Sequence, residues 1–394
     1  MEARRVYLAG AVRTPIGNFG GALAASSAAH LAGVAATAAI ERSGVPRDAV
    51  DEVLLGHARM AGNGPNLARQ VVRRAGLADA VPAFTIHKAC ASGMQAVVSA
   101  AQSIRLGDSD VALAGGVEHM SSVPYLAMDV RWGRKLGDEP LLDAMYRDGY
   151  LCPICNQLMG ETSETLASEF AIPREEQDRY AQRSNQRAVR AWDEGRFTPR
   201  VVPVSVGEGK RAVTVERDEH PRGETTLDEL AKLRPVFKKD GSVTAGNASA
   251  ITDGAAALVV LSETAVKAHD VKPQAVLLGA VSVGVDPARM GLGPVPATRK
   301  LLDRHKMKLE QIDVIELNEA FASQVLACDR ELKLDHDKLN PNGGGIALGH
   351  PTGMSGTRII VELVHELARV NGRYGLATLC VSGGMGMAVL VERV

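Results

Sequence analysis

Residues 340–356 read NPNGGGIALGHPTGMSG, and they lead into a segment, Thr352–Val370, whose apolar spacing predicts a helix. Six glycines surround a single histidine, His350. Ordering a loop with this many glycines costs backbone entropy, which indicates that the backbone must approach a ligand closely. The alternative is a tight turn that holds a structural histidine. A nucleotide-binding loop is excluded because His350-Pro351 stands where that loop requires Lys-Ser/Thr.

A segment nearer the start of the chain has the same order of predicted elements. A predicted strand, Ala83–His87, leads to Cys90-Ala-Ser-Gly-Met, a predicted helix at Ala91–Leu106 and a strand that ends in Gly115-Gly116. The glycine-rich stretch is likewise followed by a helix and by a strand that passes through Cys380. We interpret this internal similarity as a duplicated βαβ layer, which would place one reactive side chain at the start of a helix in each half.

The remaining sequence divides into three regions. Strand and helix patterns alternate up to about residue 120 and again from about residue 244, which indicates parallel βαβ units. Between them lie both tryptophans and a long charged helix, Pro173–Gly195, which indicate an insertion. We therefore predict an N-terminal half at 1–120 that is completed by 245–270, an inserted loop domain at 121–244, and a C-terminal half at 271–394. The last two strands, Tyr374–Val381 and Met385–Val391, should form a hairpin.

Composition narrows the class of protein. A net charge of −1 and 4% aromatic residues argue against a nucleic-acid binder. Five cysteines are too few and odd in number for a disulfide scaffold, which favours a reducing compartment. No secretory signal or membrane-spanning stretch is expected, so we predict a cytoplasmic enzyme that does not bind membranes.

Several side chains could carry chemistry. Cys90 precedes a helix, whose dipole would lower the pKa of the thiol; the alternative is a small buried core residue. Cys380 opens a turn whose backbone N–H groups could hold a negative oxygen. Asn318 follows a strand, at the edge where α/β sheets place ligands, although it could simply cap a helix. Cys152-Pro-Ile-Cys155 is interpreted as two free thiols, with an oxidisable pair as the lesser alternative.

Other chemistries are poorly supported. No second cysteine pair completes a zinc site around Cys152 and Cys155, so no metal is predicted. No G-x-S-x-G elbow is present, and His365-Glu366 lacks a second histidine at the required spacing.

Together these segments resemble the thiolase family, the acyl-CoA C-acyltransferases. The motifs that carry the resemblance run nearly end to end: Val12–Gly17, Lys88–Gln95, Thr244–Ser249, Met290–Pro294, Asn318–Phe321, Gly349–Gly356 and the turn after Cys380. The resemblance implies a five-layered α-β-α-β-α fold of two duplicated halves, with the inserted loop domain covering a coenzyme A site. It also implies reversible acyl transfer, either Claisen condensation of two acetyl-CoA or thiolysis of a 3-ketoacyl-CoA, in fatty-acid metabolism such as β-oxidation. Coenzyme A would be a substrate and no cofactor would be needed. A homodimer or homotetramer is expected.

The resemblance also implies roles for particular residues. Cys90 would take the acyl group as a thioester, and His350 would accept its proton and later help to hold a thioester oxygen. Cys380 would remove or return the α-proton of the second acyl-CoA. Asn318 would hold a water that forms one oxyanion hole with His350, and the backbone N–H groups of Cys90 and Ser382 would form the other. The expected substrate contacts are Arg222 and Ser249 for coenzyme A, and Met159, Met290 and Phe321 for the acyl group.

The sequence departs from the family pattern at three places. Two of them, Leu158 and Cys152-Pro-Ile-Cys155, fall near the acyl pocket and leave the acyl chain length open between acetoacetyl-CoA and longer substrates, whereas Ser382 bears on the turn. Ser382 stands where the family commonly has glycine, Leu158 stands where short-chain thiolases usually have histidine, and Cys152-Pro-Ile-Cys155 is not a family feature. The alternatives are a carrier-protein ketoacyl synthase, which would need a second catalytic histidine, a cysteine-dependent acyl-CoA hydrolase, which would not need Cys380, and a non-catalytic scaffold.

Overall fold

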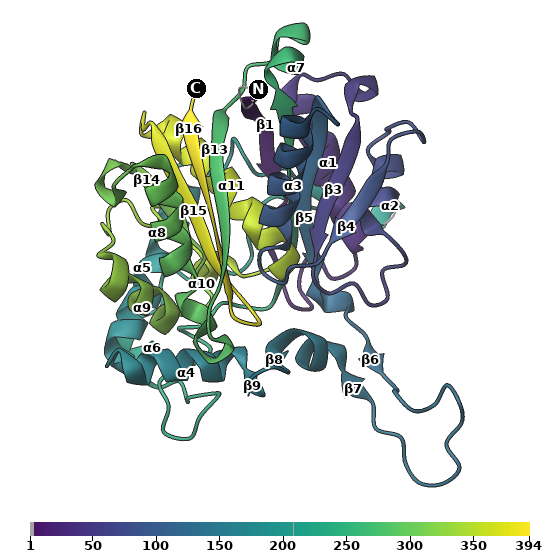
Figure 1. Cartoon of the computed structure of the whole chain (residues 1–394). Helices are drawn as coiled ribbons and strands as arrows, with labels where there is room; N and C mark the ends of the chain where they lie inside the picture. The colour runs from purple at the N-terminus through teal and green to yellow at the C-terminus, as the bar shows by residue number, and fades with distance from the viewer. Residues whose placement is uncertain (1–3, 208) are drawn as a thin grey trace.

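A computed structural model describes residues 4–207 and 209–394, so the first three residues of the predicted N-terminal half lie outside it. The long strands form one mixed sheet in the order β14-β15-β16-β13-β1-β12-β5-β3-β4. The two halves of this sheet meet where β1 pairs with β13 over only Tyr7–Val276 and Leu8–Ala275. Figure 1 shows the halves side by side, with both termini at the same end.

Each half contributes its own strands and helices. The N-terminal half contains β1 (Val6–Arg13), β2 (Gly17–Asn18), α1 (Ala28–Ser43), β3 (Glu52–His57), α2 (Leu67–Arg74), β4 (Ala83–Ile86), α3 (Ser92–Leu106), β5 (Val111–His119), β12 (Thr252–Ser262) and α7 (Glu263–Ala268). The C-terminal half contains β13 (Ala275–Gly284), α8 (Pro294–His305), β14 (Val314–Leu317), α9 (Ala322–Leu332), α10 (Gly345–Leu348), α11 (Thr352–Arg369), β15 (Tyr374–Val381) and β16 (Met385–Arg393).

The region between them combines short strands with helices, one of which spans 20 residues. These are β6 (Tyr125–Leu126), β7 (Leu142–Asp143), β8 (Leu151–Cys152), β9 (Gln157–Leu158), α4 (Met159–Glu169), α5 (Arg174–Asp193), β10 (Val204–Val206), β11 (Val213–Val215) and α6 (Leu227–Ala231). In Figure 1 the elements from β6 to α4 run beneath the two halves. The stretch between β6 and β7 projects away from the rest of the molecule.

The alternation of strands and helices predicted parallel pairing, and this is only partly correct. β3 pairs in parallel with β4 and β5, and β14 pairs in parallel with β15. The pairs β1–β12, β12–β5, β13–β16 and β15–β16 are antiparallel. The predicted hairpin explains one of them, because a turn as short as 382–384 can join only antiparallel strands.

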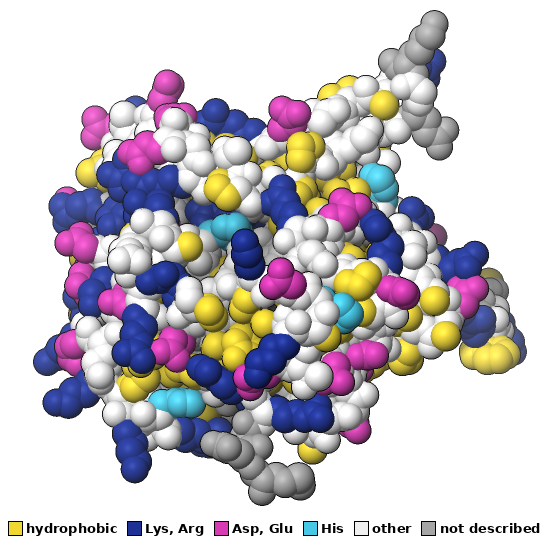
Figure 2. Space-filling view, turned by 90° about the horizontal axis from the view of Figure 1, so that it is seen from above, with side chains coloured by type: hydrophobic (Ala, Val, Ile, Leu, Met, Phe, Trp, Pro, Cys, Tyr) yellow, Lys and Arg dark blue, Asp and Glu magenta, His cyan; other side chains and the backbone are white. Residues whose placement is uncertain are grey.

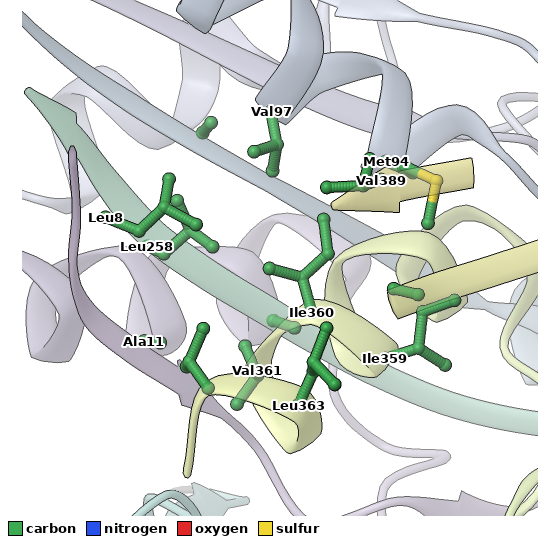
Figure 3. Close-up of a cluster of buried hydrophobic side chains, with 14 of the residues drawn as sticks. Leu8, Ala11, Met94, Val97, Leu258, Ile359, Ile360, Val361, Leu363 and Val389 are labelled. Carbon is green, nitrogen blue, oxygen red and sulfur yellow. The ribbon is translucent and has the colours of Figure 1, made fainter. Parts of the chain in front are cut away.

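Helices α3 and α11 pack against each other between the two half-sheets, and α1 and α8 cover the outer faces. The two helices share an apolar core. Figure 3 shows Met94 and Val97 of α3 meeting Ile360 of α11, with Leu258 of β12 and Val389 of β16 alongside. Both helices are therefore buried on nearly every side; α3 carries a single charged residue, Arg105, whereas α11 carries charged residues that are themselves buried, such as Arg358 and Glu362.

The first turns of α3 and α11 touch backbone to backbone. A Cβ atom at Gly356 of α11 would lie 2.4 Å from the backbone nitrogen of Met94 in α3. The neighbouring strand is equally close, since a Cβ atom at Gly116 of β5 would lie 2.2 Å from the carbonyl oxygen of Gly353 in α11. Only glycine leaves room for such an approach. The two central helices therefore begin side by side, and the residues just before each helix are brought to the same place.

A buried charge network ties the insertion to both halves. Arg13 of β1 donates two hydrogen bonds, of 2.7 and 2.9 Å, to Asp218 and one of 2.7 Å to Glu362 of α11. Arg200 places its Nε 2.9 Å from the second oxygen of Glu362. All four side chains are buried, and burial without a partner would strongly destabilise each of them. The insertion is therefore fastened to the same helix that carries the glycine contact.

The surface differs from this interior. Figure 2 shows Lys and Arg side chains interspersed with Asp and Glu on the face that it presents, in keeping with a net charge near zero. Within residues 4–207 and 209–394, no helix is both long and apolar enough to cross a membrane.

The glycine contact predicts that Gly116→Ala destabilises the protein. The new methyl group would meet the backbone of Gly353, which cannot move aside like a flexible side chain, so we expect a loss of about 1–3 kcal/mol in the free energy of unfolding. Urea denaturation measures the change. Gly284→Ala is the matched control, because the nearest atom to a Cβ there lies 4.0 Å away. Equal stabilities of the two variants would refute a tight contact at Gly116.

Candidate active site

A cavity of about 290 Å³ lies where the two central helices begin. Its wall contains four predicted catalytic or oxyanion-hole residues, Cys90, His350, Cys380 and Ser382. It is mostly apolar otherwise, and part of it comes from the insertion through Tyr146, Tyr150, Leu158, Met159 and Phe237. Both halves and the insertion therefore build one enclosed site whose size is near the lower end of ligand pockets.

Cys90 lies between β4 and α3, in a turn that is fixed by Ser92. The Ser92 hydroxyl accepts a 2.8 Å hydrogen bond from the Lys88 N–H and donates one of 2.7 Å to the Ala89 carbonyl. Ala89 itself has a φ of 45°, which is unfavourable for a residue with a Cβ. The strained turn holds the sulfur at the cavity wall.

The prediction that the helix N-terminus lowers the pKa of Cys90 is wrong in net direction. Burial in the apolar wall raises the pKa of the Cys90 thiol, and this effect outweighs the positive charge of Arg59 and the N–H groups of Ser382 and Cys90, which lower it. Cys90 therefore rests as a thiol and needs a base to become a nucleophile.

His350 is held in one tautomer by Ser355. Its Nδ1 lies 2.6 Å from the Ser355 hydroxyl, which itself donates to the Pro351 carbonyl at 2.9 Å. Since the hydroxyl proton is committed to that carbonyl, the hydroxyl oxygen accepts from Nδ1–H, and Nε2 carries the free lone pair. Nε2 has no partner within the described residues.

The charge state of His350 follows from its surroundings. Burial, together with the positive charges of Arg358 and Arg59, lowers the pKa of His350 to about 3. The imidazole is therefore neutral at physiological pH, and its Nε2 is able to accept a proton.

Cys380 lies in β15 next to the turn that contains Ser382. Burial raises the pKa of the Cys380 thiol well above its ordinary value, and a negative charge on Cys90 raises it further. The turn itself is tight, since a Cβ atom at Gly384 would lie 2.4 Å from the Val285 carbonyl oxygen. The structure thus brings the second sulfur to the same cavity as the first.

Asn318 is close to this group but does not line the cavity. It is fully buried, and its Oδ1 accepts a 3.1 Å hydrogen bond from Arg358. Its Nδ2 has no partner among the described residues, so both N–H groups of this amide are free to donate. Arg358 also lowers the pKa of His350 by its charge, which links the surroundings of the two side chains.

The predicted substrate contacts fall into two places. Ser249, Met159, Met290 and Phe321 all line the cavity. Arg222 lies outside it, in a groove of about 270 Å³ that also contains His220 and Gly246. Ala245 lines both the groove and the cavity, so the two are neighbours.

Cys152 and Cys155 lie on the β8–β9 hairpin. Both are free thiols in this structure, and Cys152 packs against the cluster that contains Cys380. No group of three or more His, Cys, Asp or Glu residues in the described part of the chain is arranged to hold a metal ion.

Sequence reasoning missed several residues of the site. Ser355 could have been found from its place one turn beyond His350, and Arg59 from its place after a parallel strand, at the edge where ligands bind. Tyr146 and Tyr150 gave no signal because a short π-helix, Tyr146–Tyr150, in the insertion positions them.

Glu319, named in the sequence only as the neighbour of Asn318, anchors the glycine-rich loop. One of its oxygens accepts from Tyr180 (2.8 Å) and Asn340 (3.0 Å), and the other accepts from Ser184 (2.6 Å) and from the backbone of Ile346 (3.1 Å). The carboxylate thus joins α5 of the insertion to the loop that precedes His350.

Glu319→Gln should destabilise this junction. The amide NH₂ would replace an oxygen that accepts two hydrogen bonds, so buried donors would face each other at a cost of about 1–3 kcal/mol. Thermal unfolding measures the loss. Glu331→Gln, which removes a partly exposed surface pair with Arg299, is the control and should change stability by less than about 1 kcal/mol. An equal effect of both changes would contradict the anchoring role.

Comparisons with known proteins agree with this geometry. The family model described as "Thiolase, N-terminal domain" matches residues 6–264, and "Thiolase, C-terminal domain" matches residues 271–393. The chain is 47% identical over 388 residues to a probable acetyl-CoA acetyltransferase of Escherichia coli K12, which covers 98% of this chain and 99% of the relative.

Two solved structures are similar over nearly the whole length. A Bacillus anthracis acetyl-CoA acetyltransferase is 46% identical with a TM-score of 0.97, covering 100% of this chain and 99% of that one. A human mitochondrial 3-ketoacyl-CoA thiolase in complex with CoA is 44% identical with a TM-score of 0.96, covering 99% and 98%.

Proposed function

The chain belongs to the thiolase family of acyltransferases, with the thiolase fold that its sequence predicts, and on that premise we propose how its own residues carry out the reaction. The substrates are acyl-CoA thioesters and CoA, and the reaction is the condensation of two acetyl-CoA or, in reverse, the thiolysis of a 3-ketoacyl-CoA. One observation supports this above all: Cys90, Cys380 and His350 line one cavity although they are far apart in sequence.

Acylation begins with transfer of the Cys90 proton to Nε2 of His350. The neutral imidazole with a free lone pair on Nε2 suits this role, and a negative sulfur beside it favours its protonated form. The thiolate then attacks the thioester carbon of the first acyl-CoA. The CoA thiolate leaves with the proton of Cys380, which gives free CoA, an acyl-Cys90 thioester and a Cys380 thiolate.

Condensation uses the thiolate that acylation leaves behind. Acylation removes the negative charge of Cys90, which is one of the causes that raise the pKa of Cys380, so the acyl-enzyme is the state in which Cys380 holds its proton least tightly. The Cys380 thiolate removes the α-proton of the second acyl-CoA, and the resulting enolate attacks the acyl-Cys90 carbonyl. The C–S bond breaks, Cys90 leaves as the thiolate and takes back the proton that His350 accepted, and Cys380 keeps the proton that it took from the substrate.

Two sets of donors would stabilise the negative oxygens. His350 and a water held by the free Nδ2 of Asn318 bind the enolate oxygen, and the N–H groups of Cys90 and Ser382 bind the tetrahedral oxyanion. Neither a metal nor a resident cofactor is required, since every proton in this scheme moves between these side chains and the substrates.

We assign the substrate contacts from the same geometry. Met159, Met290 and Phe321 enclose the acyl group, and Ser249 lies beside the thioester end of CoA. Arg222, in the neighbouring groove, binds the CoA phosphates. The prediction of fatty-acid metabolism, including β-oxidation, in the cytoplasm remains a proposal that rests on the substrate class.

A homodimer or homotetramer is also proposed. Edge strand β4 exposes Phe84, and the projecting stretch between β6 and β7 exposes Trp132 and Leu136 at 93% and 90%. Apolar side chains this exposed are typical of protein interfaces. Sedimentation velocity measures the oligomeric state.

Cys90→Ser should lower the thiolysis kcat by more than about 100-fold, because a neutral hydroxyl is a far weaker nucleophile than a thiolate at neutral pH. Steady-state assays with acetoacetyl-CoA and longer 3-ketoacyl-CoA check this and reveal the chain-length preference. Cys155→Ser, outside the cavity, is the matched control. Turnover near that of the wild type would refute an acyl-Cys90 intermediate.

Cys380→Ala should separate the two half-reactions. The variant should still form acyl-Cys90, more slowly because CoA must leave without the proton of Cys380, and mass spectrometry detects this acyl-enzyme. Exchange of acetyl-CoA α-protons with deuterium should slow by about 10²- to 10⁴-fold because the base is missing. Exchange at the wild-type rate would contradict the role of Cys380 as base.

A further inference from the structure

One charged side chain of the cavity takes no part in the proposed reaction. Arg59, which follows β3, is 5% exposed and lines the cavity together with Cys90 and His350. Its guanidinium lies under the insertion, 5.5 Å from the Tyr150 ring centroid and so close to Gly149 that a Cβ there would lie 2.5 Å from its Nε. The cation is therefore built into the wall of the site.

The Arg59 guanidinium has no carboxylate within ion-pair distance among the described residues. Its Nε is buried without a hydrogen-bond partner, and none of the described carboxylates lies within 4.0 Å of its nitrogens. The positive charge of Arg59 lowers the pKa of Glu118, but the Glu118 carboxylate is hydrogen-bonded to other groups. Its oxygens accept from the Arg59 backbone N–H (2.9 Å), the Thr352 hydroxyl (2.5 Å) and the Gly353 N–H (2.9 Å). Burying a charge without a partner is unfavourable, so a ligand that brings an anion here would be favoured.

We propose that Arg59 binds a carboxylate at the far end of the acyl chain, so that the preferred substrates are 3-ketoacyl-CoA thioesters of dicarboxylic acids. This inference rests on the proposed thiolase reaction. A planar guanidinium and a carboxylate form paired, charge-assisted hydrogen bonds. The apolar side chains Leu158, Met159 and Met290 suit the methylene groups between the thioester and that carboxylate. A methyl-terminated chain would leave the cation covered and unpaired.

The competing explanation is that Arg59 only stabilises the Cys90 thiolate and does not contact the acyl chain. Its positive charge favours that thiolate. In that case, loss of Arg59 would slow every substrate alike, because all of them pass through the same nucleophile. Carboxylate recognition instead predicts a loss that depends on the end of the acyl chain.

The test compares matched pairs of 3-ketoacyl-CoA thioesters of equal chain length, one ending in methyl and the other in carboxylate. We expect the wild type to favour the carboxylate member at the best length, and Arg59→Gln to reduce that preference in kcat/KM by about 10- to 100-fold, the usual effect of losing a charge-assisted hydrogen bond. Arg59→Lys keeps the cation and should retain part of the preference. Arg147→Gln removes an exposed guanidinium from the same covering segment and should change both members of each pair by the same factor.

The outcomes separate the explanations. Equal losses for both members in Arg59→Gln, with slower alkylation of Cys90 by iodoacetamide, would overturn the carboxylate site and assign Arg59 to the thiolate. A wild type that prefers the methyl-terminated member at every length would also overturn it, while leaving the thiolase reaction intact. No CoA-dependent cleavage of any thioester would instead refute the proposed function itself.

Discussion

The contact between the first turns of α3 and α11 governs the rest of the molecule. Gly356 lets two buried helices, one from each half, meet without side chains between them, and Gly116 and Gly353 let strand β5 approach α11 as closely. Because Cys90 and His350 stand just before these helices, the contact converts a duplicated fold into one site. The network of Arg13, Asp218, Arg200 and Glu362 then fastens the insertion to α11, so the cover of the site is held by the same helix.

Burial, more than any helix dipole, sets the protonation states in this site. It raises the pKa values of Cys90 and Cys380 and lowers that of His350, so all three groups are neutral at rest. A site of neutral groups responds strongly to any charge that appears within it. The proposed order of proton transfers follows from this sensitivity. Burial keeps Cys380 protonated at rest, a thiolate on Cys90 would raise its pKa further, and acylation of Cys90 prevents that negative charge.

The sequence reveals the parts of this design that depend on local pattern. The hairpin of β15 and β16 and the similar order of elements around Cys90 and His350 are visible as spacing or composition. The antiparallel strand pairs and the net direction of the Cys90 pKa were not predictable, because pairing and desolvation depend on which distant segments become neighbours. Arg59 illustrates the same limit: its position after a strand is visible, but its lack of a partner is a property of the assembled cavity.

The glycine contact also limits how this catalyst can be redesigned. Sliding one central helix along the other would enlarge a pocket whose walls are flexible. Here the backbones of the two central helices are in direct contact, so such a shift would break the catalytic geometry. New specificity must then be sought in the cover, where Tyr146, Tyr150 and Leu158 come from short, irregular segments. A mutant library confined to that cover could change the preferred acyl group while leaving the reacting atoms in their positions.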